Sequence, residues 1–272
     1  DLLRNGLQPI LMTLADRNRL TTAGLDGLAH LLQLLTNHFK VEIGVKLLDH
    51  LSALAEPAML RQAAAGSLDT NEQLKTLAAI VRVFHLLPDT AYQFLPRLLM
   101  YVAEIESHLR RSGPTPFTDM LTLFLDHFAE HTIRYFFESD QLQNPRLLRL
   151  LRLALASDHG ASLRRQLDER ADVYILPLLS DASKTTHIRV ALQLIEPLVA
   201  HGTPSSSSWL LVHRPVLDRL IALWNTPDMH AQRRAEADVL ATKPPLTPLY
   251  LSLLPSALRH EPLVDVHMSL LD

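Results

Sequence analysis

Residues Leu7 to Pro57 read LQPILMTLADRNRLTTAGLDGLAHLLQLLTNHFKVEIGVKLLDHLSALAEP and contain three helix-like segments in succession. Apolar residues recur in this stretch at steps of three and four, at Leu25, Leu28, Leu32, Leu35 and Phe39. This spacing places them on one stripe of a helix of about 18 residues that starts at Thr21 or Thr22. A second helix is expected from about residue 43 to residue 56, because a helix usually ends before a proline. Two helices with a short link predict a helical hairpin.

The same helical rhythm continues along the rest of the chain. Further helices are expected at 71–87, 91–111, 116–138, 145–157, 161–179, 186–201, 209–225, 229–242 and 248–271, the last interrupted near Pro255. Hydrophobic residues make up 47% of the chain, and glycine supplies only 8 of the 272 residues. This composition favours packed helices over strands and tight hairpins. We therefore predict an all-α fold.

Two segments share one order of residue types. Leu7-x-Pro9-Ile10-Leu11 is followed by Asp16 and a small-residue helix, and Ile175-Leu176-Pro177-Leu178-Leu179 is followed by Asp181 and a similar helix. Both resemble HEAT units, in which two helices recur every ~40 residues. Such units bury their apolar faces by stacking on neighbours. We expect one α-solenoid of HEAT-like helical hairpins over residues 1–272, with loops at 202–208 and 243–248.

Composition and charge exclude several classes of protein. The formal net charge is −3, so the chain lacks the overall positive charge that attracts nucleic acid. No cysteine is present for disulfides or thiolate metal sites, and no apolar run approaches the ~18 residues that span a bilayer. The chain starts at Asp1 without methionine and closes in an apolar run, so we expect an internal piece of a longer polypeptide.

The sequence offers one candidate for catalysis. His127, Glu130 and His131 form the pattern H-x-x-E-H, in which two histidines bind zinc and the glutamate acts on metal-bound water. No acidic residue stands out as a third ligand, and aromatic residues surround the motif, which favours ordinary packing. Phosphate-binding loops, kinase motifs and the nucleophile elbow are missing from the sequence. We predict no enzyme activity, cofactor, metal site or small-molecule substrate, and a zinc hydrolase is the less favoured alternative.

One segment carries a regular row of positive charges. Arg146, Arg149 and Arg152 lie three residues apart in PRLLRLLR, so on a helix they form a basic edge beside a leucine face. Such an edge suits docking of an acidic protein partner. The alternative is a solvated face whose charge is neutralised by Asp158 and by the acidic pair Asp168-Glu169.

Four Thr-Pro dipeptides stand at residues 115–116, 203–204, 226–227 and 247–248. They match proline-directed phosphorylation sites, but threonine also suits the N-cap of a helix and proline its first position. We expect at least three of the four to be helix starts.

The amino-acid sequence of the first third of the chain resembles the helical-repeat region of the TRRAP family, the pseudokinases of transcriptional co-activator complexes. The resemblance is densest in Leu25-Asp26-Gly27-Leu28-Ala29, in Phe39-Lys40-Val41-Glu42-Ile43-Gly44 and in Leu47-Leu48-Asp49-His50. A second, weaker similarity covers residues 79–88. Beyond Arg111 only the helical rhythm is shared.

The resemblance implies a nuclear scaffold without catalytic activity. Members of this family have a long HEAT solenoid, a FAT region and a kinase-like domain that lacks catalytic residues, and they act in histone acetyltransferase complexes of the SAGA type. The expected partners are co-activator subunits and acidic transcription activators, without direct nucleic acid or membrane contact. A transport receptor, or an active kinase of the same superfamily, is the alternative solenoid protein.

Overall fold

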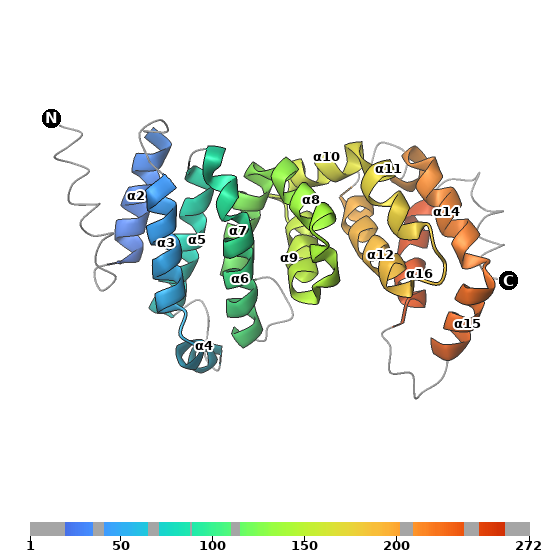
Figure 1. Cartoon of the computed structure of the whole chain (residues 1–272), viewed down its shortest axis with the longest axis horizontal. Coiled ribbons are helices and arrows are strands. Elements are labelled where there is room, and N and C mark those ends of the chain that lie inside the picture. Colours follow the sequence, from blue (N-terminus) through green and yellow to red (C-terminus); the bar gives the residue numbers. More distant parts are fainter. Residues whose placement is uncertain are drawn as a thin grey trace. The chain divides into compact units, whose positions relative to one another are not determined.

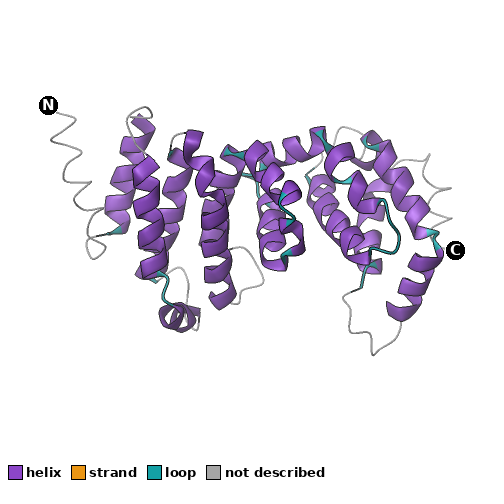
Figure 2. Cartoon of the chain, in the orientation of Figure 1, coloured by secondary structure: helices purple, strands orange, loops and turns teal. Residues whose placement is uncertain are grey.

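The computed structural model describes residues 20–34, 41–64, 71–87, 89–109, 115–201, 209–236 and 245–258, in which every regular element is a helix (Figure 2). The all-α prediction is therefore confirmed for these residues. The chain divides into two compact units, Asp1–Leu163 and Arg164–Asp272, and each is described by itself. The prediction that residues 1–272 form one solenoid stays a prediction.

Unit 1 stacks helices that are close in sequence (Figure 1). Its elements are α2 (Thr22–Leu34), α3 (Val41–Leu54), α4 (Pro57–Ala64), α5 (Glu72–Val83), η3 (Phe84–Leu86), η4 (Asp89–Phe94), α6 (Leu95–Leu109), α7 (Pro116–His127), α8 (Ala129–Glu138), η5 (Gln141–Gln143) and α9 (Pro145–Ala156). Helices α2, α5, α7 and α9 contact one another in that order, while α3 and α4 pack on α6, which packs on α9. This order of contacts is typical of stacked helical hairpins.

Aromatic rings connect the layers of unit 1. Phe84 meets Phe94 edge-on at 5.9 Å between ring centroids and Phe124 at 6.1 Å, and Phe124 meets Phe128 at 5.0 Å. All four side chains are buried. Edge-to-face pairs contribute about 0.5 to 1.5 kcal/mol beyond the area that they bury, so this cluster helps fix how successive hairpins stack.

The two helices of the opening stretch form close to where the sequence predicts them. Thr21 caps α2, because its hydroxyl accepts a hydrogen bond from the Gly24 amide at 3.1 Å. The stripe Leu25, Leu28 and Leu32 is buried, and α3 buries Leu47, Leu48 and Leu51. The rest of the predicted stripe, Leu35 and Phe39, and the segment before residue 20 lie outside the described residues. Helix α4 was not predicted, although its first residue is Pro57, which suits the first helical position.

Two long helices predicted in unit 1 are divided. The range 116–138 breaks at Phe128 (φ −106°, ψ 41°), where the ring packs on Phe124 and the Thr132 hydroxyl donates to the Leu125 carbonyl at 3.1 Å. The range 91–111 begins instead as the 3-10 helix η4, and the α-helix starts at Leu95. Pro96 has no N–H to offer the carbonyl four residues earlier, so the α-helix starts beside it.

Unit 2 contains the remaining helices. Its elements are α10 (Ala161–Glu169), which starts at the end of unit 1, α11 (Ala171–Tyr174), η6 (Leu176–Leu179), α12 (Thr185–Ala200), α13 (Trp209–Val212), α14 (Arg214–Trp224), α15 (Pro227–Glu236) and α16 (Thr247–Leu258). Helix α12 contacts η6, α13 and α16, and α14 contacts η6, α11, α13 and α15. The centre of this unit is apolar, with Ile188, Leu192, Ile195 and Leu223 buried.

Prolines and turns divide the predicted helices of unit 2 as well. The range 161–179 breaks at Arg170 (φ −126°) and ends as a 3-10 helix that contains Pro177. The range 209–225 breaks at His213, because Pro215 has no amide hydrogen with which to continue the helix from α13. The expected interruption at Pro255 is wrong, since α16 continues to residue 258.

The predicted loops are only partly described. The loop at 202–208 lies outside the described residues, as does 243–244 of the second loop. That second loop ends at residue 246, because α16 already begins at Thr247. Helix α15 begins at Pro227, two residues before the predicted start.

The Thr-Pro pairs that the structure describes all lie at helix starts. Thr115 and its partner Thr118 form a capping box on α7, and the Thr226 hydroxyl accepts from the Met229 amide at 3.3 Å on α15. Thr247 differs, because it is the first residue of α16, after Leu246, and its hydroxyl donates to Glu236 at 2.6 Å. The pair Thr203-Pro204 lies outside the described residues.

Candidate functional site

The basic edge lies on α9 in unit 1. Asn144 starts this helix, since its side-chain oxygen accepts from the Arg146 amide at 3.1 Å, and Pro145 occupies the first turn. Leu147, Leu150 and Leu151 are buried on the face of α9 turned to α6 and α7. The buried leucines therefore set the orientation of α9. The three-residue spacing of the arginines places them in a row beside the leucine face.

The three arginines of the basic edge are not equivalent. Arg146 is exposed, whereas Arg149 and Arg152 are half-buried. Arg149 Nη1 lies 3.2 Å from Glu106 Oε2, in an ion pair between α9 and α6. This pairing differs from the expectation that Asp158, Asp168 and Glu169 neutralise the edge, because Glu106 stands 43 residues earlier in the sequence.

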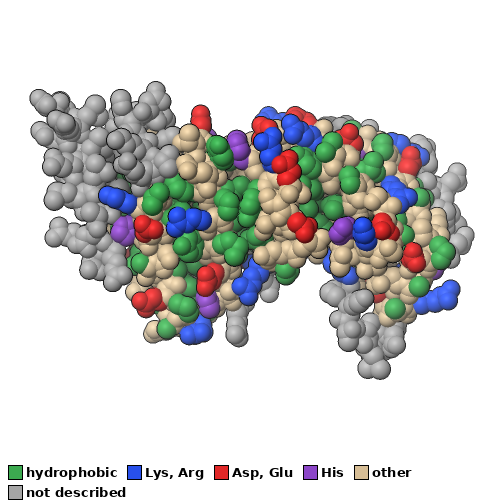
Figure 3. All heavy atoms as spheres, viewed as in Figure 1, with side chains coloured by type: hydrophobic (Ala, Val, Ile, Leu, Met, Phe, Trp, Pro, Cys, Tyr) green, Lys and Arg blue, Asp and Glu red, His purple; other side chains and the backbone are tan. Residues whose placement is uncertain are grey.

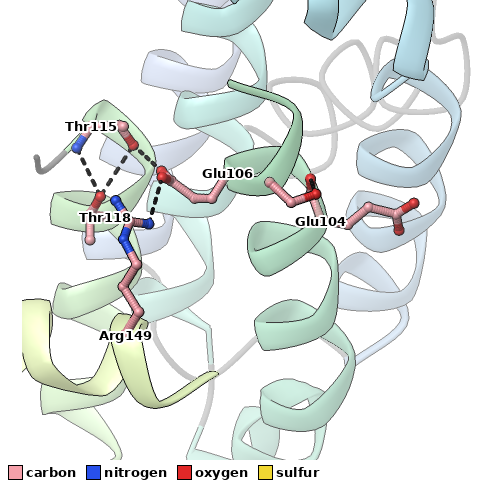
Figure 4. Close-up of polar contacts among 6 residues, drawn as sticks. Glu104, Glu106, Thr115, Thr118 and Arg149 are labelled. Atoms are coloured by element: carbon pink, nitrogen blue, oxygen red, sulfur yellow. Dashed lines mark hydrogen bonds and ion pairs between the residues drawn. The ribbon is translucent and has the colours of Figure 1, made fainter. Parts of the chain in front are cut away.

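Glu106 is the centre of a buried polar network (Figure 4). One of its carboxylate oxygens accepts from the Thr115 hydroxyl, and the other pairs with Arg149. The Thr115 amide donates in turn to the Thr118 hydroxyl at 2.9 Å. Only 3% of the Glu106 side chain is exposed. The network joins α6, the start of α7 and α9, and it satisfies a charge that is costly to bury alone.

The sequence could not have shown this partner of Arg149. Glu106 stands on an apolar helix among Val102, Ala103, Ile105 and Leu109, where a carboxylate is usually read as a residue on the solvent face, as Glu104 of the same helix is. The position of Glu106 along the helix is the one sequence signal for its burial. It follows the buried residues Leu98, Leu99 and Val102 at steps of three and four.

The H-x-x-E-H segment lies at the turn between α7 and α8, so its two histidines do not lie on one continuous helix. His131 stacks on Tyr92 with 4.0 Å between ring centroids, and His127 meets Phe128 edge-on at 4.6 Å. Glu130 pairs with Arg134 at 3.4 Å. Within residues that the structure describes, no three His, Asp or Glu side chains are grouped as metal ligands. The three residues are thus occupied with packing and surface pairing.

Asp168 of the acidic pair binds within unit 2. Its Oδ1 accepts from Trp209 Nε1 at 2.6 Å and lies 2.7 Å from His213 Nε2. The Trp209 and His213 rings lie 4.2 Å apart. Asp168 therefore joins the end of α10 to Trp209 of α13 and to His213.

Glu236 fastens the last two helices of unit 2. Its carboxylate accepts from the Leu246 amide at 2.6 Å, from the Thr247 amide at 3.0 Å and from Gln232 Nε2 at 2.7 Å. Burial alone would raise the pKa of this carboxyl, but these hydrogen bonds outweigh burial and lower the pKa below its ordinary value. The ionised carboxylate is the form that holds the start of α16.

Charges of both signs are mixed on the visible face of the described residues (Figure 3). Lysine and arginine side chains alternate there with acidic and apolar ones, and no large patch of a single sign appears on that face. None of the helices in the described part of the chain combines the length and the apolar character needed to cross a membrane.

Stacked helical hairpins define an α-solenoid, a class of protein whose repeats build an extended surface. The family model "Tra1 HEAT repeat ring region" matches residues 1–272. The chain belongs to this family, and its solenoid is built of HEAT repeats as predicted.

Relatives support this assignment. The chain is 45% identical over 135 residues to the SAGA complex/NuA4 acetyltransferase complex subunit Tra1 of Schizosaccharomyces pombe, covering 50% of this chain and 4% of that protein. It is 37% identical over 177 residues to the Saccharomyces cerevisiae subunit of the same description, covering 64% of this chain and 5% of that protein. The human transformation/transcription domain-associated protein is 22% identical over 264 residues, covering 87% of this chain and 7% of that protein. The chain thus spans a small part of the length of the relatives that it matches.

Proposed function

We propose that this chain is a non-enzymatic scaffold segment of a Tra1-type subunit of histone acetyltransferase co-activator complexes, acting in the nucleus. The observation that carries the proposal is the match of the Tra1 ring-region family over all 272 residues. Two fungal relatives are subunits of the SAGA and NuA4 complexes by name, which supports the assembly that we propose. A stacked-hairpin fold suits this role, because each added repeat extends the surface that partners can use.

The proposed partners are co-activator subunits and acidic transcription activators, and the proposed contact is the basic edge. Arginine is suited to such contacts, because its planar guanidinium donates two parallel hydrogen bonds to a carboxylate. Arg146 is the exposed member of the edge, and Arg149 is 32% exposed beside it. Arg152 completes the row one turn further along the helix. No contact with nucleic acid, membrane or a small-molecule substrate belongs to the proposal.

Affinity capture of the full-length protein that contains this segment tests the assembly. We expect acetyltransferase-complex subunits to co-purify with it from nuclear extract. Recovery of transport cargo without these subunits would contradict the proposal.

The basic edge needs its own test. Arg146→Ala is expected to weaken binding of an acidic peptide about two- to fivefold, the range of one exposed ion pair. Arg61→Ala is the matched control, because Arg61 is also exposed but lies on α4. Equal affinities of the two variants would remove the edge as the contact.

A further inference from the structure

Glu106 is a buried carboxylate with a single cation within ion-pair distance among the described residues. That cation is Arg149, at 3.2 Å, and the Thr115 hydroxyl is the other donor that the network supplies. Removing one partner of a buried ion pair leaves a charge without compensation, which costs far more than loss of an exposed pair. The fold therefore holds Arg149 against Glu106.

Arg149 is reachable from solvent as well. It is 32% exposed and stands one helical turn from exposed Arg146 on the basic edge. An acidic segment that approaches Arg146 also reaches the guanidinium of Arg149. This is the group that Glu106 binds from the interior. Each N–H of a guanidinium points in one fixed direction, so the donors held by Glu106 are not offered outward.

We infer that Glu106 is an internal competitor that restrains acidic partners at the basic edge, by holding Arg149 inward. This inference rests on the proposed function, because it assumes that the partner is an acidic peptide. Binding of the peptide to Arg149 and pairing of Glu106 with Arg149 are linked equilibria, so weakening one strengthens the other. The polar network at the start of α7 is thereby coupled to the surface of α9.

The inference is tested on the full-length protein with a fluorescent 20-residue peptide of alternating glutamate and leucine, by anisotropy at fixed salt. Glu106→Gln keeps an acceptor for Thr115 and removes the charge, and we expect it to tighten peptide binding about two- to fivefold. Glu104→Gln is the matched control, since Glu104 is exposed on the same helix and points away from Arg149 (Figure 4). Glu104→Gln is expected to leave the peptide affinity unchanged, or to raise it only by the small amount that loss of one distant negative charge produces.

A double variant separates competition from a general charge effect. In Glu106→Gln/Arg149→Met the gain must disappear relative to Arg149→Met alone, because the gain acts through Arg149. Circular dichroism checks the helix content, and Glu106→Met replaces Glu106→Gln if that content falls.

Three outcomes overturn different claims. Equal affinities of Glu106→Gln and Glu104→Gln, together with a loss in Arg146→Ala, would overturn the internal competitor and leave the basic edge in place. An unchanged affinity in Arg146→Ala would overturn the basic edge as the contact, and a gain in Glu106→Gln that survives Arg149→Met would assign the effect to long-range charge.

Discussion

Gly44 and Gly27 both lie inside helices of the opening hairpin, but their surroundings differ. A Cβ at Gly44 would lie 2.2 Å from Phe94 Cε2, whereas a Cβ at Gly27 meets nothing within 4 Å. We expect Gly44→Ala to lower stability by about 1 to 3 kcal/mol, because Phe94 is held by Phe84 and has little room to move. Gly27→Ala should raise stability by about 0.5 to 1 kcal/mol through helix propensity. Hydrogen exchange of α2 and α3 amides measures both, and similar shifts in the two variants would refute the packing account.

Arg149 and Arg146 give a second matched pair at this scale. Arg149→Met leaves the buried Glu106 charge without its cation, so we expect a loss of about 2 to 4 kcal/mol in the stability of unit 1. Arg146→Met removes an exposed charge and should change stability by less than about 0.5 kcal/mol. Faster amide exchange at the start of α7 in the first variant alone is the expected result. A loss of the same size in both variants would mean that Glu106 is compensated in another way.

Tyr250 carries a buried hydroxyl without a hydrogen-bond partner among the described residues. Burial raises the pKa of this phenol well above its ordinary value of 10.0. The contribution of neutral Tyr250 to stability is therefore complete below pH 10 and is lost as pH rises above it, since the unfolded chain releases the proton first. Tyr250→Phe should keep or raise stability by up to about 1 kcal/mol and flatten that alkaline loss. Thermal melts between pH 8 and 11 measure it, and a clear loss in the variant at pH 8 would show that the hydroxyl has a partner.

At the scale of the element, the sequence predicted where helices begin better than it predicted where long helices break. Thr21, Asn71 and Thr115 cap helices because short polar side chains reach free amides at helix starts, and this rule operates within a few residues. The breaks at Phe128 and Arg170 were not predicted, because no proline or glycine at either position marks the end of a helix. The basic edge was predicted from spacing, but its counter-ion Glu106 was not, since that pairing depends on how α6 packs on α9.

The junction of α15 and α16 supplies a prediction at the same scale. The Glu236 pKa lies below its ordinary value, so the ionised group adds stability above pH 4.5 that is lost as pH falls through the lowered pKa. We expect amides of Leu246 and Thr247 to exchange faster on acidification below pH 4.5. Glu236→Gln should show fast exchange at neutral pH already and little further change in acid. In the unsubstituted chain, amide exchange is corrected for the intrinsic rate. If the corrected rate did not depend on pH, Glu236 would not be the group that holds the start of α16.

At the scale of the whole molecule, the chain is organised by repetition of helical hairpins. Each helix of unit 1 packs on elements near to it in sequence, and the family match extends along all 272 residues. Function in such a chain is expected on its exposed edges, so single substitutions on the surface should alter one contact while the fold persists. That is the pattern expected of Arg146, whereas removal of Arg149, the cation that pairs with buried Glu106, is expected to lower the stability of unit 1.

The proposed membership of the full-length protein in an acetyltransferase complex is tested most directly by the enzyme activity that purifies with it. Full-length protein captured from nuclear extract would be assayed for histone acetyltransferase activity. We predict that activity co-purifies with the protein and is retained through a second affinity step on another complex subunit. Captured protein that is free of acetyltransferase activity would contradict it.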